Sequence, residues 1–166
     1  MKRLAILWLI LSLSACGFHL RGAVNFPSWF TSVAIIANNT AHGLVQTIES
    51  RLEGYKIRVL TNSNAAPYWL IIEDTMKKEQ LTAVSSTTIP RQYQLTYKVR
   101  YKLIAAKDGK ILVPSSTVSS TRQLTVNNDS MLGSDNQESL LYDEMRDDAV
   151  MQMISQLSHY LSRNAQ

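Results

Sequence analysis

The sequence predicts an α/β sandwich in which a mixed β-sheet of four to five strands carries two helices packed on one face. A β-branched run, a stretch of helical periodicity and a second short apolar run follow one another between residues 32 and 60. Polar and apolar residues alternate over 92–103, as in a half-buried strand. Apolar residues after position 135 recur at helical spacing. Together these patterns favour one layer of helices on one sheet.

The first predicted unit is strand, helix, strand. Residues 32–37 (SVAIIA) form a β-branched run closed by two asparagines, which is typical of a buried strand. The helix that follows should bury one face and end at Gly54, and residues 55–60 favour a second strand. Such a unit predicts a parallel pair joined by a right-handed crossover. The apolar helix face is made of Leu44, Val45, Ile48 and Leu52.

A third strand should begin at Tyr68, after a turn over 62–67, and become polar toward Lys78. Residues 81–90 are rich in Ser and Thr and predict a loop with some irregular strand. In the alternating strand that follows, the odd positions from Tyr93 to Leu103 form the apolar face, and the even positions form the polar face. This strand is the clearest half-buried element of the sequence.

A hairpin should connect the alternating strand to a return strand over 110–126. Asp108 and Gly109 predict a two-residue turn, because both positions tolerate positive φ. Pro114 cannot donate a ladder hydrogen bond, so it should lie on an edge strand or at a bulge. A bulge would exchange the faces of all later residues, so the face of Arg122 stays open.

The last predicted element is a long helix. Residues 127–133 are turn formers, and Asp135 with Glu138 fits a capping box at the helix start. Its acidic residues indicate either a solvated face or a docking surface for a basic partner. They are Asp143, Glu144, Asp147 and Asp148. The apolar stripe consists of Leu141, Met145, Ala149, Met153, Leu157 and Leu161.

The N-terminus predicts export and lipid anchoring. Two basic residues precede a short apolar run over 4–11, too short for the ~20 residues of a membrane-spanning helix, and the run leads to Leu13-Ser14-Ala15-Cys16. A cysteine after Leu-Ser-Ala is the bacterial lipobox arrangement, and Cys16 is the single cysteine of the chain. We expect a signal peptide at 1–15, a lipidated tether at 16–30 and one domain at 31–166. The alternative is an ordinary signal peptide with a cysteine nearby.

Charge and motifs argue against several function classes. The formal net charge of +4 includes Lys2 and Arg3, which the predicted signal peptide would remove, so nucleic acid is not expected as a partner. His19, His42 and His159 are scattered, and neither catalytic motifs nor metal-ligand spacings occur. We therefore expect no enzyme, no metal and no cofactor. A hydrolase would need His42 or His159 beside a nucleophile in one pocket.

A row of cations is the candidate binding feature. Lys98, Arg100 and Lys102 are alternate residues of one strand, so their side chains leave the same face at intervals of roughly 6.5–7 Å. Arg91 stands at the start of that strand. Such a row suits spaced phosphates, with arginine as a bidentate donor and lysine as a point charge. The alternative is a solvated strand face that lysines keep soluble.

The run Cys16-Gly17-Phe18-His19-Leu20-Arg21-Gly22 resembles the mature N-terminus of the LptE family of lipopolysaccharide-assembly lipoproteins. The order of elements and the Tyr93-Gln94-Leu95 strand are similar as well. The resemblance implies a non-enzymatic lipoprotein, lipid-anchored in the Gram-negative outer membrane. Such a protein would plug the lumen of the LptD β-barrel, assist its assembly and help deliver lipopolysaccharide to the outer leaflet.

The resemblance also implies lipopolysaccharide binding by basic residues in two regions. Arg91 lies in the first, before the middle strand, whereas the second, residues 127–136, contains no lysine or arginine. An alternative is an envelope lipoprotein that acts as a protein adaptor without binding glycolipid. The expected lipopolysaccharide-binding residues are Arg91, Lys98, Arg100, Lys102 and Arg122.

Overall fold

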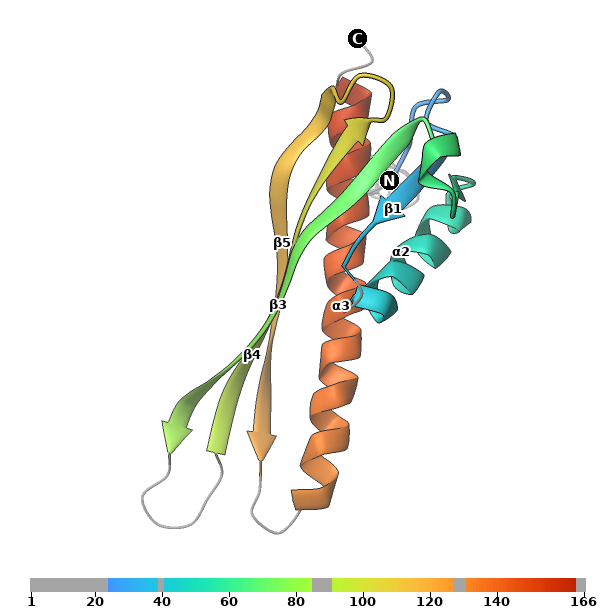
Figure 1. Ribbon diagram of the computed structural model, residues 1–166. Helices are drawn as coiled ribbons and strands as arrows, with labels where there is room; N and C mark the ends of the chain where they lie inside the picture. Colours follow the sequence, from blue (N-terminus) through green and yellow to red (C-terminus); the bar gives the residue numbers. More distant parts are fainter. Residues whose placement is uncertain (1–23, 39–40, 85–90, 127–130, 164–166) are drawn as a thin grey trace, which may run out of the picture.

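The computed structural model describes residues 24–38, 41–84, 91–126 and 131–163 (Figure 1). The predicted signal peptide and Cys16 lie outside these residues. The elements are β1 (Ser32–Ile36), α2 (His42–Gly54), β2 (Arg58–Val59), the short 3-10 helix η2 (Ser63–Ala65), β3 (Tyr68–Val84), β4 (Arg91–Ala105), β5 (Ile111–Val126) and α3 (Met131–Arg163).

The strands form a five-stranded mixed sheet in the order β2-β1-β3-β4-β5. β1 is parallel to both β2 and β3, whereas β3, β4 and β5 are successively antiparallel. The predicted parallel pair and the predicted α/β sandwich with two helices are therefore confirmed. Figure 1 shows that β3, β4 and β5 extend well beyond β1 and α2, and that α3 runs along their whole length.

The core lies between the sheet and the helices, as the periodicity predicts. The odd positions of β4 from Leu95 to Leu103 are at most 5% exposed, and Tyr93 is partly buried. The α2 residues Leu44, Ile48 and Leu52 are also buried. The predicted α3 stripe is buried from Met145 to Leu161 and partly buried at Leu141.

Several element ends differ from the predictions. β2 is confined to Arg58–Val59, and β3 continues to Val84, into the predicted loop, because β4 pairs with it throughout. α3 begins at Met131, so the capping box predicted at Asp135 is wrong. Met131 and Leu132 are favourable helix formers, and a long helix extends across one glycine at little cost because propagation is easier than nucleation.

The β4–β5 turn is also longer than predicted. The Ala105 N–H donates to the Lys110 carbonyl at 2.9 Å, which encloses residues 106–109. Gly109 has φ of 69°, whereas Lys56 is the non-glycine residue with positive φ in the described part of the chain, so Asp108 does not adopt the expected conformation. Instead the Asp108 carboxylate accepts the Lys110 N–H at 3.0 Å, a local bond typical of aspartate in turns.

Two bulges lie on either side of the same part of β4. The β3 register shifts between Ile72 and Asp74, which makes Glu73 an extra residue. The β5 register shifts between Val113 and Ser116, where Pro114 lies. Because β5 is also an edge strand, Pro114 satisfies both predicted alternatives at once.

The N-terminal segment is docked on the domain from the first described residue. Val24 and Phe26 pack against the core. The Asn25 N–H donates to the Ser158 hydroxyl of α3 at 3.1 Å, and that hydroxyl donates to the Asn25 carbonyl at 2.7 Å. The described part of the predicted tether is therefore held against α3. Among the described residues, none of the helices has the length and apolar character needed to cross a membrane.

Candidate functional site

From the Glu73 bulge to the ends of the long strands at Val84, Arg91 and Val126, the sheet face opposite the helices is covered by no helix among the described residues, and this part is here called the open face. Nearer the β4–β5 turn the same face carries Ile36, Trp69, Ile71 and Ile104, and η2 lies against Trp69, whose Nε1 donates to the Ser63 carbonyl. Alternate positions of three long strands form the open face, and two bulges add a residue each. Apart from Met76 these side chains are polar or charged. They are Glu73, Asp74, Met76, Lys78 and Gln80 of β3; Gln92, Gln94, Thr96, Lys98, Arg100 and Lys102 of β4; and Ser115, Thr117, Ser119, Thr121, Gln123 and Thr125 of β5.

The predicted cation row lies on the open face. Lys98 and Arg100 are exposed and Lys102 is partly buried. β4 presents all three because the even positions point away from the buried odd positions. Arg91 is the first residue of β4, and the placement of its side chain is outside the described set.

Two carboxylates of β3 form ion pairs with Arg100 and Lys102 of the row. Lys102 Nζ lies 2.9 Å from Glu73 Oε1, and Arg100 Nε lies 3.7 Å from Glu73 Oε2. Arg100 Nη2 is also 3.8 Å from Asp74 Oδ2. The bulge at Glu73 explains this arrangement, since it puts two consecutive acidic side chains on one face.

Glu73 is the centre of this polar cluster. The Ser115 hydroxyl, displaced by the second bulge, donates to Glu73 Oε2. That hydrogen bond and the hydrogen bond from Lys102 hold the pKa of the Glu73 carboxyl below its ordinary value. The carboxylate form is therefore the one that this site stabilises.

Lys98 differs from Arg100 and Lys102. It lies opposite Met76 of β3 and Ser119 of β5, and within the described residues it has no ion pair. An anion that approaches the Lys98 ammonium group would not have to displace any described carboxylate. Lys98 is thus the member of the row whose charge is most available.

Arg122 lies on the other face of the sheet. It stands opposite the buried Leu95 and forms an ion pair with Asp148 of α3, whose carboxylate also accepts a hydrogen bond from Ser120 at 3.2 Å. The face of Arg122, left open by the sequence, is therefore the helix-covered face. It does not share a surface with Lys98, Arg100 and Lys102.

Three of the four acidic residues of the α3 cluster form ion pairs with arginines of the same domain. Asp143 pairs with Arg146 at 3.0 Å, Asp147 with Arg51 at 3.4 Å, and Asp148 with Arg122. These contacts favour a structural role over a docking surface for a basic partner.

A groove of about 550 Å³ separates α2 from α3. Thr47, Arg51, Arg146 and Met151 are among its lining residues, and its described lining contains no histidine. His159 is exposed near the end of α3. No group of three potential metal ligands occurs among the described residues. The placement of the His42 side chain lies outside the described set, and His159 does not line this groove.

Sequence reasoning missed Glu73 and Asp74, which set the charge of the open face. The only available signal was the change to polar residues after Ile72. Periodicity alone cannot place the two acids on one face, because strict alternation assigns them to opposite faces.

The fold is that of small bacterial lipoproteins. The solution structure of an uncharacterized lipoprotein B from Nitrosomonas europaea is 25% identical, with a TM-score of 0.70 over 88% of this chain and 93% of that chain. Rare lipoprotein B from Shewanella oneidensis is 15% identical, with a TM-score of 0.65 over 81% of this chain and 98% of that chain.

The sequence comparisons identify the family. A sequence model described as LptE, lipopolysaccharide-assembly, matches residues 30–157. The LPS-assembly lipoprotein LptE of Photorhabdus laumondii is 26% identical over 148 residues, which are 89% of this chain and 80% of that protein. The chain belongs to the LptE family. It is a lipopolysaccharide-transport lipoprotein of the Gram-negative outer membrane and not an enzyme.

Proposed function

We propose that this protein, anchored through acyl groups on Cys16, plugs the lumen of an LptD-like β-barrel, assists its assembly and helps deliver lipopolysaccharide to the outer leaflet. Membership of the LptE family supports the role in transport. The properties of the open face are the observation that supports the plug. This face is long, rich in Ser, Thr and Gln, and free of covering helices among the described residues, and these properties suit the polar interior of a membrane barrel.

Lipopolysaccharide would contact the open face along β4. Lys98 offers an ammonium group free of described carboxylates, so it would meet a phosphate first. Arg100 and Lys102 would then exchange Glu73 and Asp74 for phosphate oxygens, which accept the same charge-assisted hydrogen bonds. Arg91 has the parity of the odd positions and pairs with Val126, so it does not continue the row on the open face; it would meet lipopolysaccharide from the end of the strand.

Arg122 has a different role in this proposal. To bind a phosphate it would have to leave Asp148, and it faces α3 instead of the open face. We assign it to the attachment of β5 to α3. The lipopolysaccharide-binding set is then Arg91, Lys98, Arg100 and Lys102.

Charge reversal tests the binding row. Lys98→Glu should weaken lipopolysaccharide binding about tenfold at low salt, since a charge-assisted contact is worth roughly 1.5–3 kcal/mol and about 1.4 kcal/mol is tenfold. Adding Glu at Arg91, Arg100 and Lys102 should weaken it further, and salt should reduce the difference. Arg58→Glu, an equal charge change on the exposed edge strand β2, is the control. Unchanged affinity in the fourfold variant would eliminate the row as the binding site.

Two further measurements separate the proposal from the adaptor alternative. Mass spectrometry of the mature protein should find an acylated Cys16 as its first residue. Co-expression with an LptD-like barrel should give a stable complex that also retains lipopolysaccharide. A complex with the barrel from which lipopolysaccharide is absent, together with no binding by the free protein, would favour the adaptor.

A further inference from the structure

Five aromatic side chains form a cluster at the end of the domain where the described chain begins. Phe26 stacks on Phe30 with ring centroids 5.5 Å apart and contacts Tyr55 at 5.9 Å. Trp29 contacts Phe30 at 5.9 Å and Tyr68 at 5.4 Å. Phe30 is buried, whereas Trp29 is 39% exposed and Tyr55 is 36% exposed. The cluster thus joins the core through Phe30 and is exposed to solvent at Trp29 and Tyr55.

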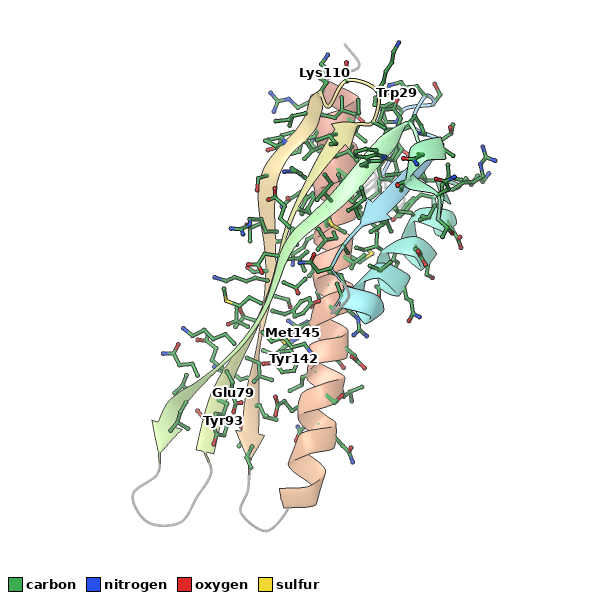
Figure 2. All side chains as sticks on the ribbon, in the orientation of Figure 1. Trp29, Glu79, Tyr93, Lys110, Tyr142 and Met145 are labelled. Carbon is green, nitrogen blue, oxygen red and sulfur yellow. The ribbon has the colours of Figure 1, made fainter. Side chains whose placement is uncertain are left out.

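Lysines and an exposed isoleucine lie at the same end of the domain as the aromatic cluster. Lys56 follows Tyr55 directly and is exposed. Tyr68 pairs with Ala105, so the β4–β5 turn with Lys107 and Lys110 lies at the same end, and Figure 2 shows Trp29 and Lys110 there. Ile111, next to Lys110, is 62% exposed. The three lysines have two acidic neighbours in sequence, Glu53 and Asp108.

The chain that precedes the domain is short. Val24 packs against the core, and eight residue steps separate it from Cys16. Fully extended, eight residues span at most about 26–29 Å. A lipid on Cys16 therefore keeps Val24 within that distance of a bilayer, and Phe26, which belongs to the aromatic cluster, is two residues further along the chain.

We propose that the aromatic end docks on the phospholipid leaflet that holds the anchor, with Trp29 and Tyr55 at headgroup level. This inference rests on the acylation of Cys16 proposed above. Trp and Tyr prefer the membrane–water interface because their rings are apolar and their N–H and O–H groups remain hydrated. Lys56, Lys107 and Lys110 would attract anionic headgroups. The short tether makes docking intramolecular, so weak contacts suffice.

Tryptophan fluorescence provides the test. The predicted mature chain has two tryptophans, Trp29 and the partly buried Trp69, whose Nε1 donates to the Ser63 carbonyl at 2.8 Å. Acylated protein purified from membranes is placed in vesicles of phosphatidylethanolamine and phosphatidylglycerol with brominated acyl chains. In the Trp69→Phe variant, Trp29 emission should shift to the blue and be quenched at least about twofold, as for an interfacial ring. In the Trp29→Phe variant, Trp69 should be quenched far less.

Charge variants show whether the lysines contribute. Combined Lys56→Glu and Lys110→Glu changes should remove most of the Trp29 quenching. Lys78→Glu, on the exposed distal part of β3, should leave it unchanged. Circular dichroism of each variant verifies the fold.

Vesicle flotation separates the two proposals. Protein that fails to float would overturn the acyl anchor and the docking with it. Protein that floats while Trp29 stays unquenched and unshifted would overturn the docking alone. Shielding of Trp29 only after addition of an LptD-like barrel would overturn the docking as well, since a protein would then cover this surface.

Discussion

The two ends of the molecule are built differently. The proximal end, where residues 24–31 and the β4–β5 turn lie, contains all five strands and both helices (Figure 1). The distal end, formed by the end of β3, the start of β4, the end of β5 and the start of α3, has three strands and one helix. Proximal residues such as Leu52 and Leu103 are fully buried, whereas Leu81 and Leu140 of the distal end are 46% and 60% exposed.

Polar contacts supplement apolar packing where α3 leaves the proximal end. Arg122 of β5 pairs with Asp148, and the Gln152 side chain donates to the Ser119 carbonyl at 3.3 Å. Further along, Lys77 Nζ lies 4.8 Å from the centroid of the Tyr142 ring. Exposed polar contacts contribute less than burial of large apolar side chains. The difference indicates that burial at the proximal end supplies most of the stability, and we expect lower local stability in the distal part of the long strands and of α3.

The largest expected effect is the difference in stability loss between a core substitution at the proximal end and an exposed substitution at the distal end. Leu103→Ala removes a fully buried side chain and should lower the free energy of unfolding by about 2–5 kcal/mol. Leu140→Ala, at a 60% exposed position, should change it by less than about 0.5 kcal/mol. Urea unfolding followed by circular dichroism measures both. Equal losses would contradict the proposed division.

A smaller effect is expected at the junction of β5 and α3. Arg122→Ala should cost about 0.5–1 kcal/mol, because both partners of its ion pair with Asp148 are partly exposed. Asp148→Asn should cost a similar amount, and the double variant should cost little more than either single change. Hydrogen exchange should locate the loss in distal amides of β5. Uniform acceleration across the whole sheet would instead indicate that the pair supports both ends.

The smallest effect concerns Glu73, which lies two residues beyond Ile71, the last β3 residue paired with β1. Its lowered pKa means that its contribution to stability is present above the ordinary carboxyl pKa and is lost as the pH falls through the lowered value. Carboxyl NMR titration should find the midpoint below 4.5. Ser115→Ala should raise the midpoint, because the leading hydrogen bond is lost, and Ser119→Ala should not. A midpoint unaffected by Ser115→Ala would refute this assignment.

Elements with a strong period could be predicted from the sequence. β4 alternates without interruption, so its buried and exposed faces follow from Tyr93 to Leu103. The α3 stripe and the parallel β1–β2 pair follow from equally local patterns. The cation row could be placed on one face for the same reason.

The remainder depends on non-local pairing. Two bulges, at Glu73 and near Pro114, decide which acids meet Arg100 and Lys102 and which face Arg122 takes. A single inserted residue reverses a strand's faces, and no local pattern fixes where insertion occurs. The extension of β3 to Val84 likewise depends on its partner β4 and not on its own polar sequence.

The length of β4 has a consequence for transport across a membrane. Its 15 residues run from Arg91 at the distal end to Ala105 at the proximal end. At about 3.3 Å per residue such a strand spans roughly 50 Å, whereas a whole bilayer is about 40–45 Å thick. In the proposed plug, with the acyl anchor in the periplasmic leaflet and β4 along the membrane normal, this one strand would reach the height of the opposite leaflet. The distal end of β4 would then contact lipopolysaccharide at the outer leaflet while the acyl chains stay in the periplasmic leaflet.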